Sequence, residues 1–207
     1  MELNPWTEAV RNHKHKVLEP LSTIPPMGAG ILQSEMLAFI CACIEQEVER
    51  VVESGRKLGY STETLAVCLP DCEILSTDRS PIKEEDERFA AYDNVTLFRG
   101  DGMQFIPSHI SGRTAVLMDG PKGWNALKVF LEVRDRVVFS GIHDLNKGNE
   151  CRAELEVNEE IWFTDDEQYV LEYGYLEDEW WPLGGYNSRD SMVAESFCLG
   201  LMKGGEW

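Results

Sequence analysis

Short apolar runs alternate with segments of helical periodicity through the first 145 residues of the chain. The runs predict β-strands, which we place at residues 51–54, 73–77, 95–99, 115–118 and 137–142. The segments between them predict helices at 61–68, 83–90, 103–110 and 124–135. Strands that alternate with helices are typical of a parallel sheet with helices on both faces. Right-handed crossovers make this an α/β fold with a doubly wound, Rossmann-like sheet.

The segment before this core combines a predicted helix, a loop and a basic patch. An apolar stripe, interrupted only by Glu35, predicts a helix over residues 31–50. Two prolines and two glycines predict a loop at 22–30. The basic patch at 11–16 is typical of a solvated helix or arm. We therefore expect an N-terminal arm or lid at residues 1–30.

The segment after the core is acidic and rich in aromatic residues. Its tyrosines and tryptophans could pack on the sheet or could form the wall of a substrate pocket. Residues 196–205 predict a last strand, which we expect to be antiparallel. A chain of 207 residues suits a single domain, with its core at 31–145 and a C-terminal segment at 146–207.

Charge and composition narrow the classes of function. The chain has 19 Lys and Arg against 37 Asp and Glu, which gives a formal net charge of −18. Nucleic acids and anionic membranes are therefore unexpected partners, because both require basic surfaces, although the charge could simply confer solubility. The sequence contains no apolar run of membrane-spanning length and no apolar segment typical of a signal peptide. Its six cysteines lack zinc-site spacing, so we expect free thiols and a cytoplasmic protein.

Candidate chemistry is concentrated where the predicted strands end, because ligands of open α/β sheets bind at the carboxyl ends of the strands. The first strand runs into "ESGRKLGYST", in which Gly55 and Gly59 permit a tight turn and close approach to a ligand. Ser61 or Thr62 could cap the helix that follows. The other strands are followed by polar residues or glycines: Asp78 and Arg79, Asp101 and Gly102, Asp119 and Lys122, and His143 and Asp144.

These strand ends resemble those of class I S-adenosylmethionine-dependent methyltransferases, particularly the small-molecule O-methyltransferases. The resemblance covers Ile31 to Leu145, with a weaker continuation, and rests on "ILQSEMLAFI", "VVESGRKLGYST", "GDG" and "MDGPKG". It implies S-adenosyl-L-methionine as the cofactor. The residues that it assigns to the donor are Glu53, Ser54, Gly55, Gly59, Ser61, Asp78, Arg79, Asp101, Gly102 and Asp119.

The resemblance also assigns roles. The loop around Gly55 would hold the methionine end of the donor, and Asp78 would accept hydrogen bonds from its ribose. Asp101 would lie near the adenine and Asp119 near the methyl group. The acceptor would be a small molecule, bounded by residues 22–30 and by the aromatic C-terminal segment. The helix at 31–49 could also pack on a copy of itself in a homodimer.

Two departures from the family pattern keep alternatives open. The first loop lacks one glycine of the usual G-x-G-x-G, and Arg56 and Lys57 stand in its middle. A non-catalytic protein that binds the donor or its product would also fit, and so would a nicotinamide-dependent oxidoreductase. Metal-dependent relatives carry an Asp–Asn pair after the fifth strand. Here Asn146 is not adjacent to Asp144, so we expect no metal.

Methyl transfer requires alignment and desolvation of the reacting atoms more than covalent chemistry. A hydroxyl acceptor also benefits from a base. His143 is the first candidate because the pKa of histidine is ordinarily near neutrality, and Lys122 is the second. Asp119 is the third candidate catalytic residue. Alternatively, His143 could orient its loop and Lys122 could be a solvated lysine.

Overall fold

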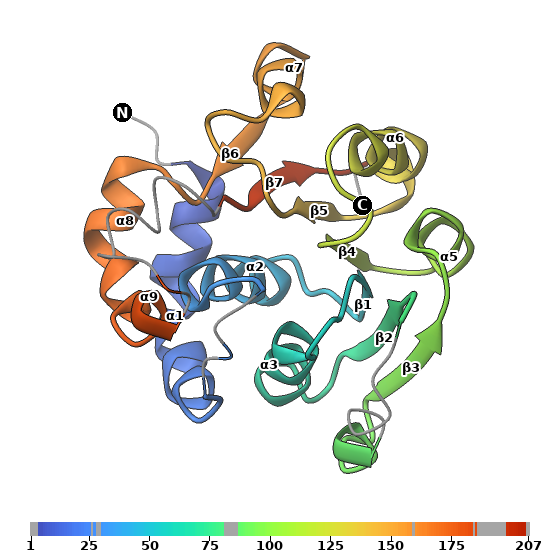
Figure 1. Cartoon of the computed structure of the whole chain (residues 1–207), viewed down its shortest axis with the longest axis horizontal. Helices are drawn as coiled ribbons and strands as arrows, with labels where there is room; N and C mark the ends of the chain where they lie inside the picture. Colours follow the sequence, from blue (N-terminus) through green and yellow to red (C-terminus); the bar gives the residue numbers. More distant parts are fainter. Residues whose placement is uncertain are drawn as a thin grey trace.

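The computed structural model describes residues 4–25, 27, 30–80, 87–158, 160–183, 185 and 198–205. Its strands form one seven-stranded sheet in the order β3-β2-β1-β4-β5-β7-β6 (Figure 1). β1 to β5 are parallel, and the last two strands in this order are antiparallel to their neighbours. The bounds are Arg50–Ser54 (β1), Glu73–Asp78 (β2), Val95–Arg99 (β3), Thr114–Met118 (β4), Phe139–Ile142 (β5), Ile161–Phe163 (β6) and Gly200–Lys203 (β7).

The predicted fold class is confirmed, as are the five predicted core strands. The central strands are mostly buried because helices cover both faces of the sheet, whereas β3 at the edge is partly exposed. One face carries α1, α2, α3 and α8, and the other carries α5, α6 and α7, each with its own apolar core (Figure 1). The helices are Pro5–Ser22 (α1), Gln33–Glu45 (α2), Tyr60–Cys68 (α3), Gly102–Ser108 (α5), Trp124–Val133 (α6), Glu150–Asn158 (α7), Glu167–Tyr173 (α8) and Trp180–Leu183 (α9), with 3₁₀ turns at Arg134–Arg136 (η1) and Gly174–Glu177 (η2).

The N-terminal helix belongs to the core, whereas the sequence predicted an arm or lid at residues 1–30. In α1, Val10, Val17 and Leu21 are buried and pack in the same cluster as α2. Of the basic residues between them, Arg11, His15 and Lys16 are exposed, whereas His13 and Lys14 are half-buried. α2 is in turn buried on almost every side, which explains its broad apolar stripe within a single chain. It is shorter than predicted, because Glu47 takes a positive φ of 49° and Arg50 already begins β1.

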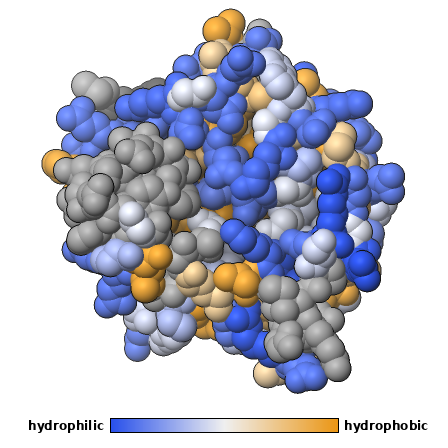
Figure 2. Space-filling view, in the orientation of Figure 1, coloured by the Kyte–Doolittle hydropathy of each residue, from blue (hydrophilic) through white to orange (hydrophobic). Residues whose placement is uncertain are grey.

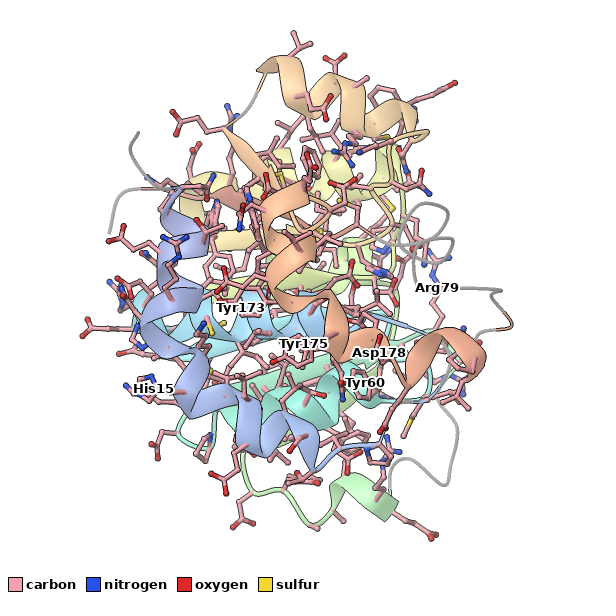
Figure 3. All side chains as sticks on the ribbon, turned by 90° about the vertical axis from the view of Figure 1, so that its left-hand side faces the viewer. His15, Tyr60, Arg79, Tyr173, Tyr175 and Asp178 are labelled. Atoms are coloured by element: carbon pink, nitrogen blue, oxygen red, sulfur yellow. The ribbon has the colours of Figure 1, made fainter. Side chains whose placement is uncertain are left out.

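The C-terminal segment contains elements that the sequence did not predict. β6 and α8 add Trp162, Tyr169 and Tyr173 to the apolar core on the side of the sheet that carries α1 and α2. Packing therefore accounts for these three rings. Figure 3 shows Tyr173 and Tyr175 beside α1, where the Lys14 ammonium lies 3.1 Å from the Tyr173 hydroxyl. Tyr186 and the first residues of the predicted last strand lie outside the described residues, as does the first half of the helix predicted at 83–90.

The surface agrees with the composition. Hydrophilic residues dominate the described part of the face seen in Figure 2, with apolar residues scattered among them. The six cysteines form no disulfide and are buried or half-buried, as predicted. Among the described helices, none is both long and apolar enough to cross a membrane.

Candidate functional site

The sheet brings the predicted residues together at one edge. Ser54 at the end of β1 pairs with Thr77 of β2 and with Met118 of β4, so these strands end at one level. Strand order reverses between β1 and β4, which is the point where open α/β sheets bind ligands. The loops that follow β1 to β5 all leave from this edge.

A buried carboxylate, Glu53, anchors the loop that follows β1. Glu53 accepts hydrogen bonds from the hydroxyls of Ser61, Thr62 and Ser76. Burial raises the pKa of Glu53, and the three hydroxyls oppose that effect. Sequence reasoning placed Glu53 and Ser61 against the donor, but these hydrogen bonds engage both side chains beneath the loop. The left-handed N-cap of α3 is Gly59 (φ 80°) and not Ser61 or Thr62.

The unusual residues of this loop do not fill its ligand side. Arg56 is buried, and its guanidinium donates to the Ser76 carbonyl at 3.1 Å. The backbone N–H of Lys57 donates to Asp78 Oδ2 at 2.9 Å, and Ser80 N–H donates to Asp78 Oδ1 at 2.7 Å. Asp78 therefore connects the first loop to the end of β2. Its carboxylate has fixed orientation and retains lone pairs for further donors.

Three loops meet at glycines. The Ser54 carbonyl accepts from the N–H groups of Asp119 and Gly120 at 2.8 and 3.0 Å, and the Ser54 hydroxyl donates to the Gly120 carbonyl. A β-carbon at Gly55 would lie 2.5 Å from the Gly120 nitrogen, and one at Gly102 would lie 2.5 Å from the Gly120 oxygen. Side chains at Gly55 or Gly102 would therefore push the loops apart.

A cavity of about 280 Å³ opens between these loops. Five predicted site residues contribute to its lining, which comprises Gly55, Thr77, Asp78, Arg79, Gly100, Gly102, Gly120, Pro121 and Lys122. A larger cavity of about 370 Å³ runs along β3 at the sheet edge, lined by residues that include Val95, Leu97 and Arg99. The smaller cavity is the candidate site, because it lies at the strand ends where the order reverses.

The rim of the cavity carries an ion pair. The Arg79 guanidinium lies 2.6 Å from Asp101 Oδ2, and Asp101 also caps α5 by accepting from Met103 N–H. That backbone hydrogen bond, with the charge of Arg79, lowers the pKa of Asp101. Figure 3 places Arg79 away from the tyrosines of the C-terminal segment.

The opposite side of the cavity contains a chain of charged groups. Asp119 Oδ1 lies 2.8 Å from His143 Nδ1 and 3.0 Å from the Lys122 ammonium. His143 Nε2 lies 3.2 Å from Glu35 Oε2, and Lys122 also contacts Asp144. Glu35 and His143 are buried, with exposed fractions of 1% and 3%.

These contacts shift the pKa values of His143 and Asp119. Burial alone would lower the pKa of His143, but the charge of Glu35 and the hydrogen bond to Asp119 raise it to about 10. Burial disfavours the Asp119 carboxylate, yet His143 and Lys122 outweigh burial and lower its pKa. The imidazole is therefore positively charged near neutral pH, which suits a positioning role better than the predicted role of base.

Sequence reasoning missed Glu35 and did not select Asp144 as a site residue. The one signal for Glu35 was a carboxylate inside an apolar stripe. Such a position requires a buried partner, but the pattern does not identify that partner. Asp144 was visible in "HDLN", and its contact with Lys122 depends on how the β4 and β5 loops pack.

A second buried acid lies near this chain. Glu177 of η2 accepts from the N–H of Ser34, in the first turn of α2, at 2.7 Å. Burial raises its pKa to about 7, against the opposing effect of this hydrogen bond. Its folded-state pKa lies above the ordinary value of 4.5, so its contribution to stability is lost as pH rises from about 4.5 through 7.

Glu177→Gln is therefore expected to stabilise the protein at pH 8, by on the order of 2 kcal/mol, with little effect at pH 4. Glutamine keeps an oxygen for Ser34 and removes the buried charge. Urea unfolding at both pH values measures the difference, with the exposed Glu179→Gln as control. Equal loss of stability at both pH values would contradict this interpretation.

Comparison with known proteins supports the fold. No protein-family model matches the sequence, and no curated protein matches it. A human methyltransferase 10 domain-containing protein is 12% identical with a TM-score of 0.51, over 95% of this chain and 96% of that one. An rRNA methylase from Streptococcus thermophilus is 14% identical with a TM-score of 0.50, over 75% and 87% of the two chains. The chain thus has the fold of the class I methyltransferases that its strand ends resemble.

Proposed function

We propose that this protein is an S-adenosylmethionine-dependent methyltransferase that acts on an oxygen of a small molecule. One observation carries the proposal: residues from the ends of β1 to β4 line one cavity at the point of strand reversal. The two similar structures described above are also methyltransferases.

The donor would lie across the glycine contact. Gly55, Gly102 and Gly120 let its methionine part approach the backbone closely. The ribose hydroxyls would donate to Asp78, whose carboxylate the Lys57 and Ser80 N–H groups already orient. The adenine would lie toward Asp101 and Arg79. Because Arg56 turns inward, the missing glycine of the loop does not block this arrangement.

The acceptor would approach beside Lys122, which is 55% exposed and lines the same cavity. Trp124, two residues later, is exposed and offers a flat apolar surface. The acceptor oxygen would attack the methyl carbon as the carbon–sulfur bond breaks and its electron pair goes to sulfur. The hydroxyl proton would pass to the partly exposed Asp144 carboxylate, since His143 is already protonated.

RNA is a less suitable acceptor, although one of the similar structures is an rRNA methylase. A formal charge of −18 repels a polyanion. A cytoplasmic location and independence of nicotinamide cofactors belong to the same proposal. A homodimer would have to form through a surface other than α2, because α2 is buried within its own chain.

Calorimetric titration with S-adenosylmethionine, S-adenosylhomocysteine and NAD tests the donor assignment. The protein is expected to bind the first two with micromolar affinity and not to bind NAD. Asp78→Asn keeps an oxygen for Lys57 N–H but removes the charge, and should weaken binding at least about 10-fold, or 1.4 kcal/mol. Asp135→Asn, on an exposed turn remote from the cavity, is the control.

Two results would refute the assignment: no binding of either sulfur ligand, or equal affinity in wild type and Asp78→Asn. Binding of both ligands without turnover of any acceptor would favour the non-catalytic alternative.

A further inference from the structure

Lys122 lies between two carboxylates from different strand ends. Its ammonium is 3.0 Å from Asp119 Oδ1, after β4, and also contacts Asp144 Oδ2, after β5. The Nδ1 atom of His143 lies 2.8 Å from Asp119 and 3.2 Å from Asp144. The four groups form one compact cluster beside the donor cavity.

The same cluster, without Lys122, has the composition of a metal site. Ligand-type atoms of Asp119, His143 and Asp144 lie within 4.8 Å of one another. Two carboxylates and an imidazole are ligands that divalent transition metals accept. Both nitrogens of the imidazole already face carboxylates here: Nδ1 lies 2.8 Å from Asp119 Oδ1, and Nε2 lies 3.2 Å from Glu35 Oε2.

Lys122 makes this site unsuitable for a divalent ion. Its ammonium contacts both carboxylates and already supplies a positive charge between them, at the place that a divalent ion would occupy. A divalent ion between Asp119 and Asp144 would have to displace it or lie within a few ångströms of it. At such distances like charges repel by several kcal/mol near a protein surface.

We propose that Lys122 is a built-in cation that replaces a divalent metal ion at this position. It holds Asp119 and Asp144 together and offers an N–H donor toward the cavity. If the proposed function is correct, that donor meets the acceptor oxygen, and methyl transfer requires no divalent metal. The replacement of a metal ion by Lys122 does not depend on which reaction the protein catalyses.

Calorimetric titration with MnCl₂ tests the inference without an acceptor. Lys122→Met keeps the apolar stem of a half-exposed side chain and removes the charge. Wild type should show no binding at about 1 mM Mn²⁺, whereas Lys122→Met should bind at least about 10-fold more tightly than wild type. The double variant Lys122→Met/Asp144→Asn should lose that gain. Lys147→Met, an exposed lysine of the neighbouring loop, should behave as wild type.

Wild type that binds Mn²⁺ as tightly as Lys122→Met would overturn the inference, and so would a Lys122→Met protein that folds and gains no affinity. Lys122→Gln provides a second neutral side chain if the methionine variant is unfolded by circular dichroism. S-adenosylhomocysteine binding by the same proteins separates the two proposals. If wild type does not bind S-adenosylhomocysteine, the proposed methyltransferase function is wrong. The Mn²⁺ result concerns Lys122 alone.

Discussion

Glu35→Gln is expected to lower the pKa of His143 and to destabilise the protein at neutral pH. An opposite charge within a few ångströms shifts a pKa by about 1–3 units. The pKa of His143, which is about 10 in the intact cluster, should therefore fall by that amount. Since one unit corresponds to about 1.4 kcal/mol, we expect a loss of on the order of 2 kcal/mol in the free energy of unfolding.

The substitution separates two roles of Glu35. Its Oε2 atom accepts from Leu32 N–H at 2.8 Å, at the start of α2, and lies 3.2 Å from His143 Nε2. Glutamine can accept both hydrogen bonds through its amide oxygen, because glutamine also serves in capping boxes. What it lacks is the negative charge. Glu35→Leu removes the cap as well and should destabilise the protein further.

The pH dependence follows from the direction of the shift. A histidine whose folded pKa is raised above 6.5 contributes stability that is complete below that pH. The contribution disappears as pH rises through about 10. The difference in stability between wild type and Glu35→Gln should therefore be complete at pH 6 to 7 and small above about pH 10.

Urea unfolding between pH 6 and 10 measures this difference, and NMR titration of the histidine side chains reports the pKa directly. Gln33→Glu, also in the first turn of α2, is the control for a charge change near the helix start. If His143 in Glu35→Gln still titrates near 10, Asp119 alone holds the proton, and Glu35 serves only as a helix cap.

The cluster around His143 shows which features a single sequence can predict and which it cannot. Apolar runs predicted the core strands because both faces of the sheet are buried, and the strand ends predicted most of the cavity lining. The contact between Glu35 and His143 could not be predicted, since the packing of α2 on the sheet brings Glu35 to the histidine. A single sequence contains the spacing within an element but not the contacts between distant elements.

The elements that the sequence did not predict have a common cause. In α1, the buried positions Val10, Val17 and Leu21 are separated by basic residues and Pro20, which weaken the helical pattern. β6 has only three residues, too few for a recognisable alternation. Acidic residues likewise mask the buried tyrosines of α8. In each case tertiary burial, and not local pattern, determines the structure.

Gly55→Ala is expected to weaken donor binding at least about 10-fold and to destabilise the protein by about 3 kcal/mol. Gly55 has a φ of 93°, which L-residues rarely adopt, and such backbone strain costs about 1–3 kcal/mol. The new methyl group would also lie 2.5 Å from the Gly120 nitrogen and 2.6 Å from the Asp119 carbonyl carbon. Both are backbone atoms of the β4 loop, so the loop itself must move.

That movement would alter the cavity on its acceptor side. Asp119 and Gly120 hydrogen-bond to the Ser54 carbonyl, and Asp119 positions Lys122 and His143. Displacement of the loop should therefore weaken S-adenosylhomocysteine binding at least about 10-fold. Calorimetry measures the affinity, and urea unfolding measures the stability.

Gly30→Ala separates steric overlap from backbone strain. Gly30 also has a positive φ, 110°, but a β-carbon there would meet no atom of the described residues within 4 Å. It should lose stability through strain alone and keep the affinity of wild type. If Gly55→Ala loses no more stability than Gly30→Ala and binds S-adenosylhomocysteine normally, the β1 and β4 loops can separate freely. The close glycine contact would then be unnecessary for the donor site.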